Sequence, residues 1–267
     1  PIDAKIINLI DAVKQIMSNY YASHGKRMIL TMAPETAFVQ GGMSAFGSIW
    51  GAYLPVIDAL RDSLEILHVQ LYNSGSMFGI DGNIYTQGTA DFIVAMTEAV
   101  IQGFNTSGGM FAGLAAHKVA VGLPACTSAA GGGYTDTATV KSALDYLLGK
   151  GPKPGTYTLV QSGGYPTLRG MMTWSINWDA VNNCSTSSYQ YAENFQKIFG
   201  TNTSLADLNQ QNIAVFPNPA SDKIYITTNS VGNEPCYIND LLGNKIKLSN
   251  GMYYVKLKNQ IVKFVKY

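Results

Sequence analysis

Apolar and polar residues alternate along the chain in two different ways, and the pattern changes near Thr201. Before that point, short apolar stretches that read as strands alternate with longer stretches whose apolar residues recur at helical spacing. The strand candidates are residues 27–33, 65–73, 118–124 and 170–176. The helix candidates are residues 3–22, about 50–63, 89–104, 137–149 and 187–199. Short apolar strands between longer helices predict a parallel sheet covered by helices, an α/β fold.

The first predicted helix gives a hint about the extent of the protein. Apolar residues recur at helical spacing from Ile6 to Met17, and Asp3 is placed to cap the helix. A chain that begins inside a packed amphipathic helix, with Pro1 and not Met, is expected to be part of a longer protein, or else a processed mature terminus. Four strands cannot close a barrel of alternating strands and helices, which needs eight. The pattern therefore predicts a half-barrel over residues 1–200.

The last part of the chain follows a different rule. A polar stretch at residues 201–212 is suited to a linker, and residues 213–267 then show period-two alternation. Gly243–Asn244 and Asn250–Gly251 are turn signals typical of hairpins. We expect this tail to form a small all-β domain resembling a sandwich.

Composition narrows the function. Charged residues make up 13% and the net charge is +1, which argues against a nucleic-acid binder because phosphate contacts need a basic face. No apolar run approaches the ~18 residues of a membrane span. The three His and three Cys show no metal-ligand spacing, so no metal or cofactor is expected. Cys126 and Cys184 either pair with each other or are free buried thiols, and Cys236 is left over.

Candidate site residues cluster where the predicted strands end. Long Gly-rich loops follow three of the strands, at residues 36–48, 74–88 and 125–136, and loops of that length at one edge of a parallel sheet are usually functional. On the second strand, period two puts His68, Gln70 and Tyr72 on one face. We expect His68 to be a satisfied inward-facing residue.

Four segments carry a resemblance to a known family: LTMAPE (30–35), VQLYN (69–73), VGLPA (121–125) and GMMTWSINWD (170–179). They resemble the last four strands of bacterial family 18 glycoside hydrolases, the chitinases. The resemblance implies the C-terminal half of a TIM (β/α)8 barrel. It also implies hydrolysis of β-1,4 N-acetylglucosamine linkages in chitin by substrate-assisted retaining catalysis.

The resemblance also assigns roles, residue by residue. Tyr72 matches the catalytic Tyr whose hydroxyl holds the reacting acetamido group, while Gln70 and Asn73 match positions that bond the same sugar. Trp174 matches the aromatic floor beneath the sugar, since a flat ring buries the apolar face of a sugar well. The alternatives are a buried Tyr72 paired with Gln70, and an ordinary core Trp174.

Two residues beside the first strand complete the predicted substrate-binding set. Glu35 is expected to line the cleft; a reading without the family would make it the general acid. Met32 is expected to form part of the wall, and Asp179 is expected to cap the next helix and not to touch substrate. Aromatic residues in or near the loops either extend the cleft or pin their own loops: Phe38, Trp50, Phe78, Tyr85 and Tyr134.

One essential group is absent. In the family the general-acid Glu ends a DxxDxDxE motif on the fourth strand, and no such motif occurs in this sequence. The general acid is therefore unassigned, and the chain by itself is expected to be inactive. Two other functions stay open: a non-catalytic chitin-binding lectin on the same barrel, and an endo-β-N-acetylglucosaminidase. The sequence leaves endo or exo action, substrate length and oligomeric state open.

The tail carries a second resemblance. FPNPASDK (216–223), NDLLGNKI (239–246) and NGMYYVKL (250–257) resemble the type A C-terminal sorting domain of the type IX secretion system. This implies export to the cell surface or the medium, with the secretion machinery as a partner of residues 213–267. The alternative is a chitin-binding module, because the tail also contains several tyrosines.

Overall fold

The structure, a computed structural model, describes residues 3–181 and 187–200 and five strand segments of the tail. The chain divides into two compact units, Pro1–Thr201 and Asn202–Tyr267, which are described separately. The assignment of these parts to a hydrolase half-barrel, a linker and a sorting domain stays a prediction.

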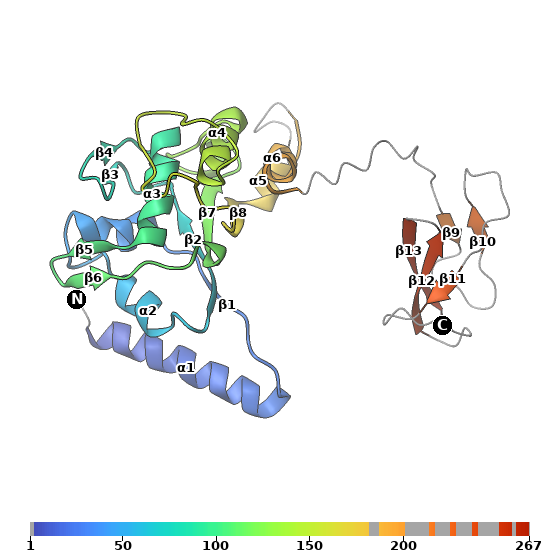
Figure 1. Cartoon of the computed structure of the whole chain (residues 1–267). Coiled ribbons are helices and arrows are strands. Elements are labelled where there is room, and N and C mark those ends of the chain that lie inside the picture. The colour runs from blue at the N-terminus through green and yellow to red at the C-terminus, as the bar shows by residue number, and fades with distance from the viewer. Residues whose placement is uncertain are drawn as a thin grey trace. The chain divides into compact units, whose positions relative to one another are not determined.

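A four-stranded parallel sheet forms the centre of the first unit (Figure 1). Its strands lie in the order β1 (Leu30–Met32), β2 (Leu64–Gln70), β7 (Val119–Pro124) and β8 (Gly170–Trp174). All four predicted strands are present, in the predicted parallel arrangement. Every residue of β7 is buried, because this strand has a neighbour on each side and helices behind it.

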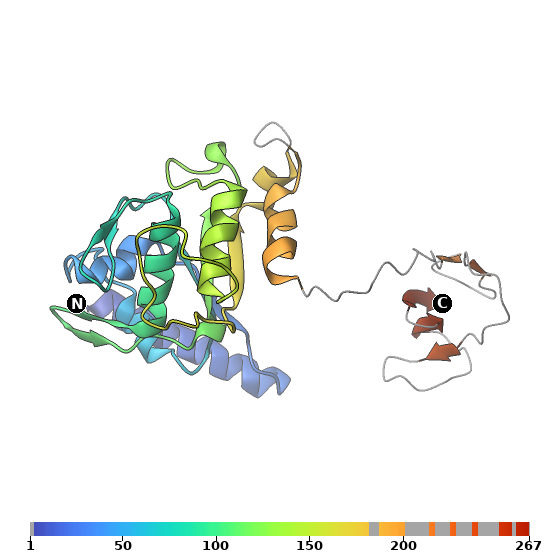
Figure 2. The ribbon, with the colours of Figure 1, turned by 45° about the horizontal axis from the view of Figure 1, so that its top comes forward.

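Helices cover one face of this sheet. Figure 2 shows α3 (Ala90–Gln102), α4 (Thr137–Leu147) and α6 (Gln190–Phe199) side by side along it, and neighbouring members of this row are in contact. The core lies between these helices and the strands, and α3 contributes nine consecutive buried residues from Phe92 to Val100. The remaining helices are α1 (Ala4–His24), α2 (Leu54–Ala59), α5 (Ile176–Ala180) and the 3-10 turns η1 (Thr36–Phe38), η2 (Gln40–Met43), η3 (Ala116–Lys118) and η4 (Thr127–Ala129).

Two short hairpins were not predicted. They are β3 (Met77–Phe78) with β4 (Ile84–Tyr85), and β5 (Phe104–Thr106) with β6 (Gly109–Phe111). Asp81–Gly82 is a hairpin signal in the sequence, and Gly82 has the positive φ of 83° that such a turn requires. Strands of two or three residues are too short for their side-chain alternation to stand out. The β1 strand is equally short, but it lies in the apolar stretch at residues 27–33, which predicted it.

The helix predicted at about residues 50–63 is much shorter. The α2 helix runs only from Leu54 to Ala59, because Gly51 takes a left-handed φ of 70° before it and Leu60 leaves the helical region after it. Apolar spacing continues through those flanking residues, so the pattern overstates the length of the helix.

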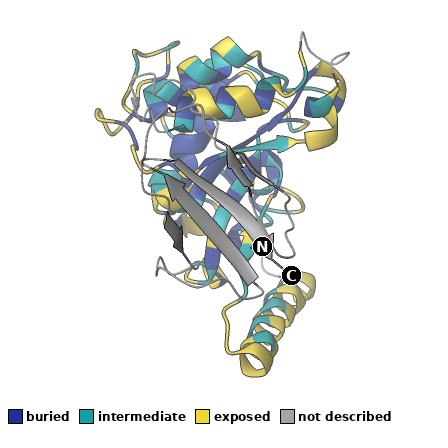
Figure 3. Cartoon of the chain, turned by 90° about the vertical axis from the view of Figure 1, so that its right-hand side faces the viewer, coloured by how far each residue is buried: buried dark blue, intermediate teal, exposed yellow. Residues whose placement is uncertain are grey.

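The expectation that the first helix is packed is wrong. Asp3 caps α1 as predicted, its carboxylate accepting a hydrogen bond from the Ile6 amide at 3.0 Å. Yet no residue of Ala4–His24 is buried. The helix contacts α2, while Ile7 and Ile16 are exposed, and Figure 3 shows it as a largely uncovered helix.

In the second unit the described segments are strands. The β9 strand (Ala214–Phe216) pairs antiparallel with β10 (Tyr225–Thr227). The β12 strand (Gly251–Leu257) pairs antiparallel with both β11 (Tyr237–Asn239) and β13 (Gln260–Lys266). The predicted hairpin around Gly243–Asn244 lies outside the described residues, and the sandwich stays a prediction.

Candidate functional site

The predicted site residues lie where β1, β2 and β8 end. The chain after β1 continues alongside β2, where the Gln70 amide donates to the Pro34 carbonyl at 2.8 Å and Glu35 forms a parallel bridge with Gln70. The Gln70 side chain donates to the Ala33 carbonyl at 2.5 Å, and the Thr36 hydroxyl donates to the Gln70 carbonyl at 2.6 Å. Gln70 thus holds the chain after β1 against the end of β2, and its expected contact with a sugar stays a prediction.

Tyr72 is buried at this edge, with 4% of its surface exposed. Its hydroxyl takes part in none of the hydrogen bonds among the described residues, and the Gln70 amide bonds to a carbonyl instead, so the two side chains do not pair. Burial raises the pKa of Tyr72, and the negative charge of Glu35 raises it further. The phenol therefore remains a neutral hydrogen-bond donor near pH 7, as its expected role requires.

Asn73 joins this edge to the loop after β7. Its backbone has a left-handed φ of 60°, and its side-chain oxygen accepts a hydrogen bond from the Gly132 amide at 3.2 Å. The Asn73 amide in turn donates to the Gly132 carbonyl at 3.2 Å. The residue is exposed, so it reaches solvent at the position where the sugar is expected while it also holds a loop.

Trp174 ends β8 opposite Pro124 and is 56% exposed, so the alternative of an ordinary core Trp is wrong for this structure. Its carbonyl accepts a hydrogen bond from the Ala125 amide at 3.0 Å, and its peptide bond to Ser175 is cis. An exposed indole at the end of a central-sheet strand is available to a ligand at the same edge as Tyr72.

Asp179 caps the next helix, as predicted. The carboxylate is 2% exposed and accepts hydrogen bonds from the amides of Tyr191 at 2.8 Å and Ala192 at 3.1 Å, in the first turn of α6. The Tyr191 hydroxyl donates to the Met172 carbonyl of β8 at 2.8 Å. Burial raises the pKa of Tyr191, with a further contribution from Asp179. Asp179 therefore stabilises the fold by holding the start of α6.

The remaining candidate residues of the cleft and its loops differ in how deeply they are buried. Met32 is half-buried against the core, and its place in the substrate wall stays a prediction. Tyr85 is buried and its hydroxyl donates to Asp81 at 2.5 Å; burial and this hydrogen bond raise its pKa to about 12, so it pins its own hairpin. Trp50 packs against the core, and the Phe38 ring lies 5.8 Å from that of Tyr53. Phe78 and Tyr134 are half-buried.

His68 departs from the expectation that it is satisfied. Its Nδ1 atom is buried and has no hydrogen-bond partner among the described residues. Burial lowers the pKa of His68, and the positive charge of Arg169 lowers it further. Cys126 is disulfide-bonded; its expected partner Cys184 lies outside the described residues, so that pairing stays a prediction.

Two polar residues that sequence analysis did not single out organise this edge. Thr36 bonds the end of β2, and Gln87 accepts hydrogen bonds from the amides of Ser74 and Gly75, both at 2.9 Å. Each acts on a residue distant in sequence or on a turn, and no local motif marks either. Only the expectation that the loop at residues 74–88 is functional pointed towards Gln87.

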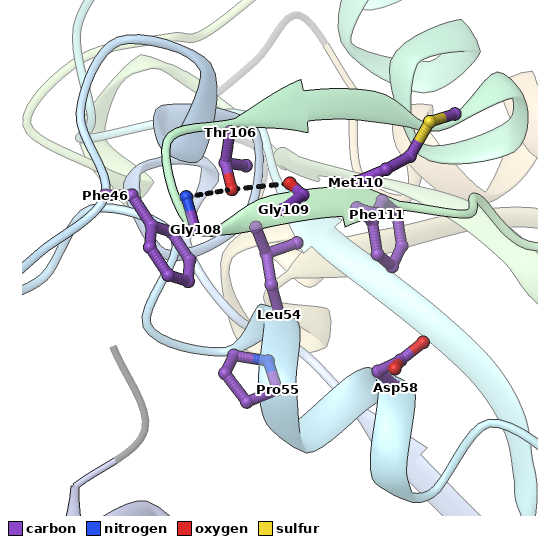
Figure 4. Close-up of a pocket in the computed structure, with 9 residues that line it drawn as sticks. All are labelled: Phe46, Leu54, Pro55, Asp58, Thr106, Gly108, Gly109, Met110 and Phe111. Carbon is purple, nitrogen blue, oxygen red and sulfur yellow. Dashed lines mark hydrogen bonds between the residues drawn. The ribbon is translucent and has the colours of Figure 1, made fainter.

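The pocket in Figure 4 lies elsewhere. It has a volume of about 360 Å³ between α2 and the β5–β6 hairpin, and its walls are mostly apolar. The residues that line it are Phe46, Leu54, Pro55, Asp58, Thr106, Gly108, Gly109, Met110 and Phe111. None of the predicted site residues lines it. Among the described residues, no group of His, Cys, Asp and Glu could hold a metal ion, and no helix is long and apolar enough to cross a membrane.

The chain resembles known proteins in sequence. It is 53% identical over 191 residues to chitinase Chi52 of Paenibacillus xylanexedens, covering 70% of this chain and 36% of that protein. It is also 53% identical over 186 residues to chitinase D of Niallia circulans, covering 68% and 35%. It is 41% identical over 226 residues to chitinase ChiA of Flavobacterium johnsoniae, covering 81% and 14%. The chain thus spans about a third or less of these relatives, and no family model matches it.

Solved structures agree. A family 18 chitinase from Chromobacterium violaceum matches with a TM-score of 0.59 and 42% identity, over 65% of this chain and 46% of that one. A structure described as a chitinase A from Streptomyces coelicolor matches with a TM-score of 0.53 and 35% identity, over 72% and 56%. These comparisons support a TIM-barrel-like α/β fold and the interpretation of this chain as the C-terminal part of a family 18 chitinase-like protein.

Proposed function

We propose that this chain is the C-terminal portion of a secreted chitinase, which hydrolyses β-1,4 N-acetylglucosamine linkages in chitin with retention of configuration. The observation that carries the proposal is the 53% identity to chitinases over most of the first unit. The neutral phenol of Tyr72, without a hydrogen-bond partner among the described residues, supports the same chemistry.

In the proposed reaction the acetamido oxygen of the sugar attacks its own anomeric carbon. The bond to the leaving oxygen breaks, and a carboxylic acid outside this chain protonates that oxygen. Water then attacks the anomeric carbon, the bond to the acetamido oxygen breaks, and the water gives its proton back to the carboxylate, so the configuration is retained. Tyr72 donates a hydrogen bond to the acetamido group as the group turns towards the anomeric carbon. Gln70 and Asn73 bond the same sugar unit. No cofactor or metal is required.

The other predicted residues shape the cleft. Trp174 offers its exposed ring as a floor for the apolar face of the sugar. Glu35 lines the cleft beside Tyr72, whose pKa is raised first by burial and then by the negative charge of Glu35. Met32 forms part of the wall.

The proposal is tested in the longer protein that contains this chain. Tyr72→Phe is expected to lower kcat by an amount equivalent to about 2–4 kcal/mol, because one hydrogen-bond donor to the reacting group is lost. The matched control is Tyr21→Phe, which removes the same hydroxyl from an exposed position on α1. Equal rates in both variants would remove Tyr72 from the chemistry.

Two other functions can be distinguished from the proposed one in the longer protein. A Glu at the end of the DxxDxDxE motif of the longer protein supports the enzyme, and another residue there supports a chitin-binding lectin. Activity on N-glycans and not on chitin would support an endo-β-N-acetylglucosaminidase. This chain alone is expected to be inactive on a chromogenic chitobioside in each case.

We also propose that residues 213–267 form a sorting domain for the type IX secretion machinery. The second compact unit begins at Asn202, and the match to Flavobacterium johnsoniae chitinase ChiA covers 81% of the chain, more than the first unit alone can supply. Deleting residues 213–267 in the native host is expected to keep the protein out of the medium. A deletion variant that is exported normally but binds insoluble chitin less well would favour a chitin-binding module.

A further inference from the structure

The main chain around Tyr72 is held by the loop after β7. Asn73 and Gly132 exchange two hydrogen bonds, described above, and Gly133 follows with a left-handed φ of 93°. A Cβ atom on Gly133 would lie 2.7 Å from the Cα atom of Tyr72 and 3.0 Å from the Leu71 carbonyl oxygen. The loop therefore rests directly on the backbone of Tyr72, and only glycine fits at that contact.

Gln87 holds the same segment from the far end of the connection at residues 74–88, after β4. Its side-chain oxygen accepts from the amides of both Ser74 and Gly75, at 2.9 Å each, so one acceptor fixes the turn that follows Tyr72 and Asn73. Its side-chain nitrogen faces the loop after β7, because a Cβ atom on Gly132 would lie 3.2 Å from that nitrogen. Gln87 thus stands between the two loops that meet beside Tyr72.

Gln87 is itself anchored to the core. It lies two residues before Thr89, whose hydroxyl accepts a hydrogen bond from the Phe92 amide at 3.2 Å and caps α3. Phe92 begins the fully buried stretch of that helix. The position of Gln87 is therefore set by the most firmly packed helix of the unit, and its two hydrogen bonds transmit that position to residues 74 and 75.

The Tyr72 hydroxyl has no hydrogen bond of its own among the described residues, so its place depends on its backbone and on packing. We propose that Gln87 is a positioning residue for Tyr72: by clamping the amides of Ser74 and Gly75, it fixes the strand end that presents the phenol to the substrate. This inference rests on the proposed function. It adds a residue that acts through the turn and not on the sugar.

The test compares two replacements in the longer protein. Gln87→Leu keeps the bulk but removes the acceptor, whereas Gln87→Glu keeps a carboxyl oxygen that can accept from both amides. We expect Gln87→Leu to lower kcat about 10- to 100-fold, as a small misplacement of a reacting group does, with a smaller change in KM. Gln87→Glu is expected to restore most of kcat. Amide hydrogen exchange at Ser74 and Gly75 is expected to quicken in the Leu variant only.

Gln161→Leu is the control, because the Gln161 side chain also bonds the backbone, here by donating to the Gly164 carbonyl, and it lies in the segment at residues 148–169 and not in either loop beside Tyr72. The inference is overturned if Gln87→Leu leaves kcat unchanged. It is also overturned if Leu and Glu variants lose kcat and unfolding free energy equally, since Gln87 then only supports the fold. Tyr72→Phe is measured in parallel: if it is fully active, the proposed role of Tyr72 fails and the inference falls with it. If it is impaired while Gln87→Leu is not, only the inference fails.

Discussion

The α1 and α3 helices are both rich in apolar residues, yet α3 is buried in the core and α1 is not. The 13 residues of α3 include nine consecutive buried ones, whereas none of the 21 residues of α1 is buried. α3 lies between the central sheet and the chain at residues 148–169, which covers its outer side through bonds to Glu98 and Asp91. α1 contacts α2, and several of its apolar side chains face solvent.

The difference shows that an apolar pattern predicts a helix but not what covers it. The strands β1 and β8 form the two edges of the four-stranded sheet in the described first unit. The α1 helix directly precedes β1 along the chain. In a closed barrel, neighbouring strands and helices would cover both edges and the uncovered side of such a helix. The exposed apolar side chains of α1 agree with the proposal that this chain is part of a larger barrel.

The largest expected effect is a difference in unfolding free energy between a substitution on α3 and one on α1. Phe92→Ala on α3 removes a ring that is 0% exposed and is expected to cost about 3–5 kcal/mol of unfolding free energy, through lost burial and the cavity left behind. Ile16→Ala on α1 changes a side chain that is 54% exposed and is expected to stay within about 0.5 kcal/mol. Urea unfolding of this chain, followed by Trp fluorescence, reports on the first unit because all three Trp lie there.

A comparable loss of unfolding free energy in Phe92→Ala and Ile16→Ala would contradict the contrast between a buried α3 and an exposed α1. It would mean that α1 is covered in solution. The same pair can be repeated in the longer protein. There, the cost of Ile16→Ala is expected to rise if the additional chain packs on α1, while the cost of Phe92→Ala stays the same. An unchanged small cost for Ile16→Ala in the longer protein would argue against that packing.

The second prediction concerns how the outer side of α3 is held. Glu98 is 0% exposed and accepts hydrogen bonds from the hydroxyls of Tyr157 and Tyr165, both at 2.6 Å, and from the Val160 amide at 2.9 Å. Burial raises the pKa of both tyrosines, and their bonds to Glu98 raise it further, so both remain donors. Glu98→Gln replaces a charged acceptor by a neutral amide and is expected to cost about 1.5–3 kcal/mol of unfolding free energy.

Glu193→Gln is the control for Glu98→Gln, since Glu193 is exposed on α6 and the same change there is expected to be nearly neutral. Hydrogen exchange at the amides of Val160 and Tyr157 supplies a local readout. If Glu98→Gln leaves both the stability and the exchange unchanged, the carboxylate does not hold this segment against α3.

The elements found from the sequence are those whose pattern is long enough to repeat. All four sheet strands and the helices α1, α3, α4 and α6 were predicted, because apolar residues recur along the sequence at each of them. The hairpin strands of two or three residues gave no such repeat. The role of Asp179 as a cap was predicted from its place after a strand, although its bonds go to a helix that begins at Gln190.

The candidate site could be predicted from the sequence less completely than the fold. A family resemblance predicts site roles for Tyr72 and Trp174, and these roles stay predictions. Gln87 bonds backbone amides 12 and 13 positions away, which no pattern of side chains encodes. Burial also depends on tertiary neighbours. For the longer protein the sequence predicts that Trp174→Ala weakens binding and rate and costs about 3–5 kcal/mol of stability, which stays a prediction. In this unit Trp174 is 56% exposed, so the cost of its truncation here is expected to be smaller.

The smallest expected effect compares two caps of identical chemistry. Asp136 caps α4 by accepting from the amides of Ala138 and Thr139, both at 3.0 Å, as Asp3 caps α1 through the Ile6 amide. Asp136→Ala is expected to cost about 0.5–2 kcal/mol of unfolding free energy, because α4 is part of the packed layer. Asp3→Ala is expected to fray the start of α1 without lowering the global stability, since that helix is not buried.

The dependence on pH gives the cap prediction a sign. The hydrogen bond from the Thr139 hydroxyl is the largest influence on Asp136 and, with the amides, holds the pKa of its carboxyl below the ordinary value. A carboxyl with a depressed pKa in the folded state stabilises that state above its unfolded pKa of about 3.9, and loses this contribution as the pH falls through the folded value. The stability difference between the wild type and Asp136→Ala is therefore expected to be constant from pH 7 to about pH 5 and to shrink below about pH 4. A difference that grows as the pH falls would mean that the cap is not held as a carboxylate.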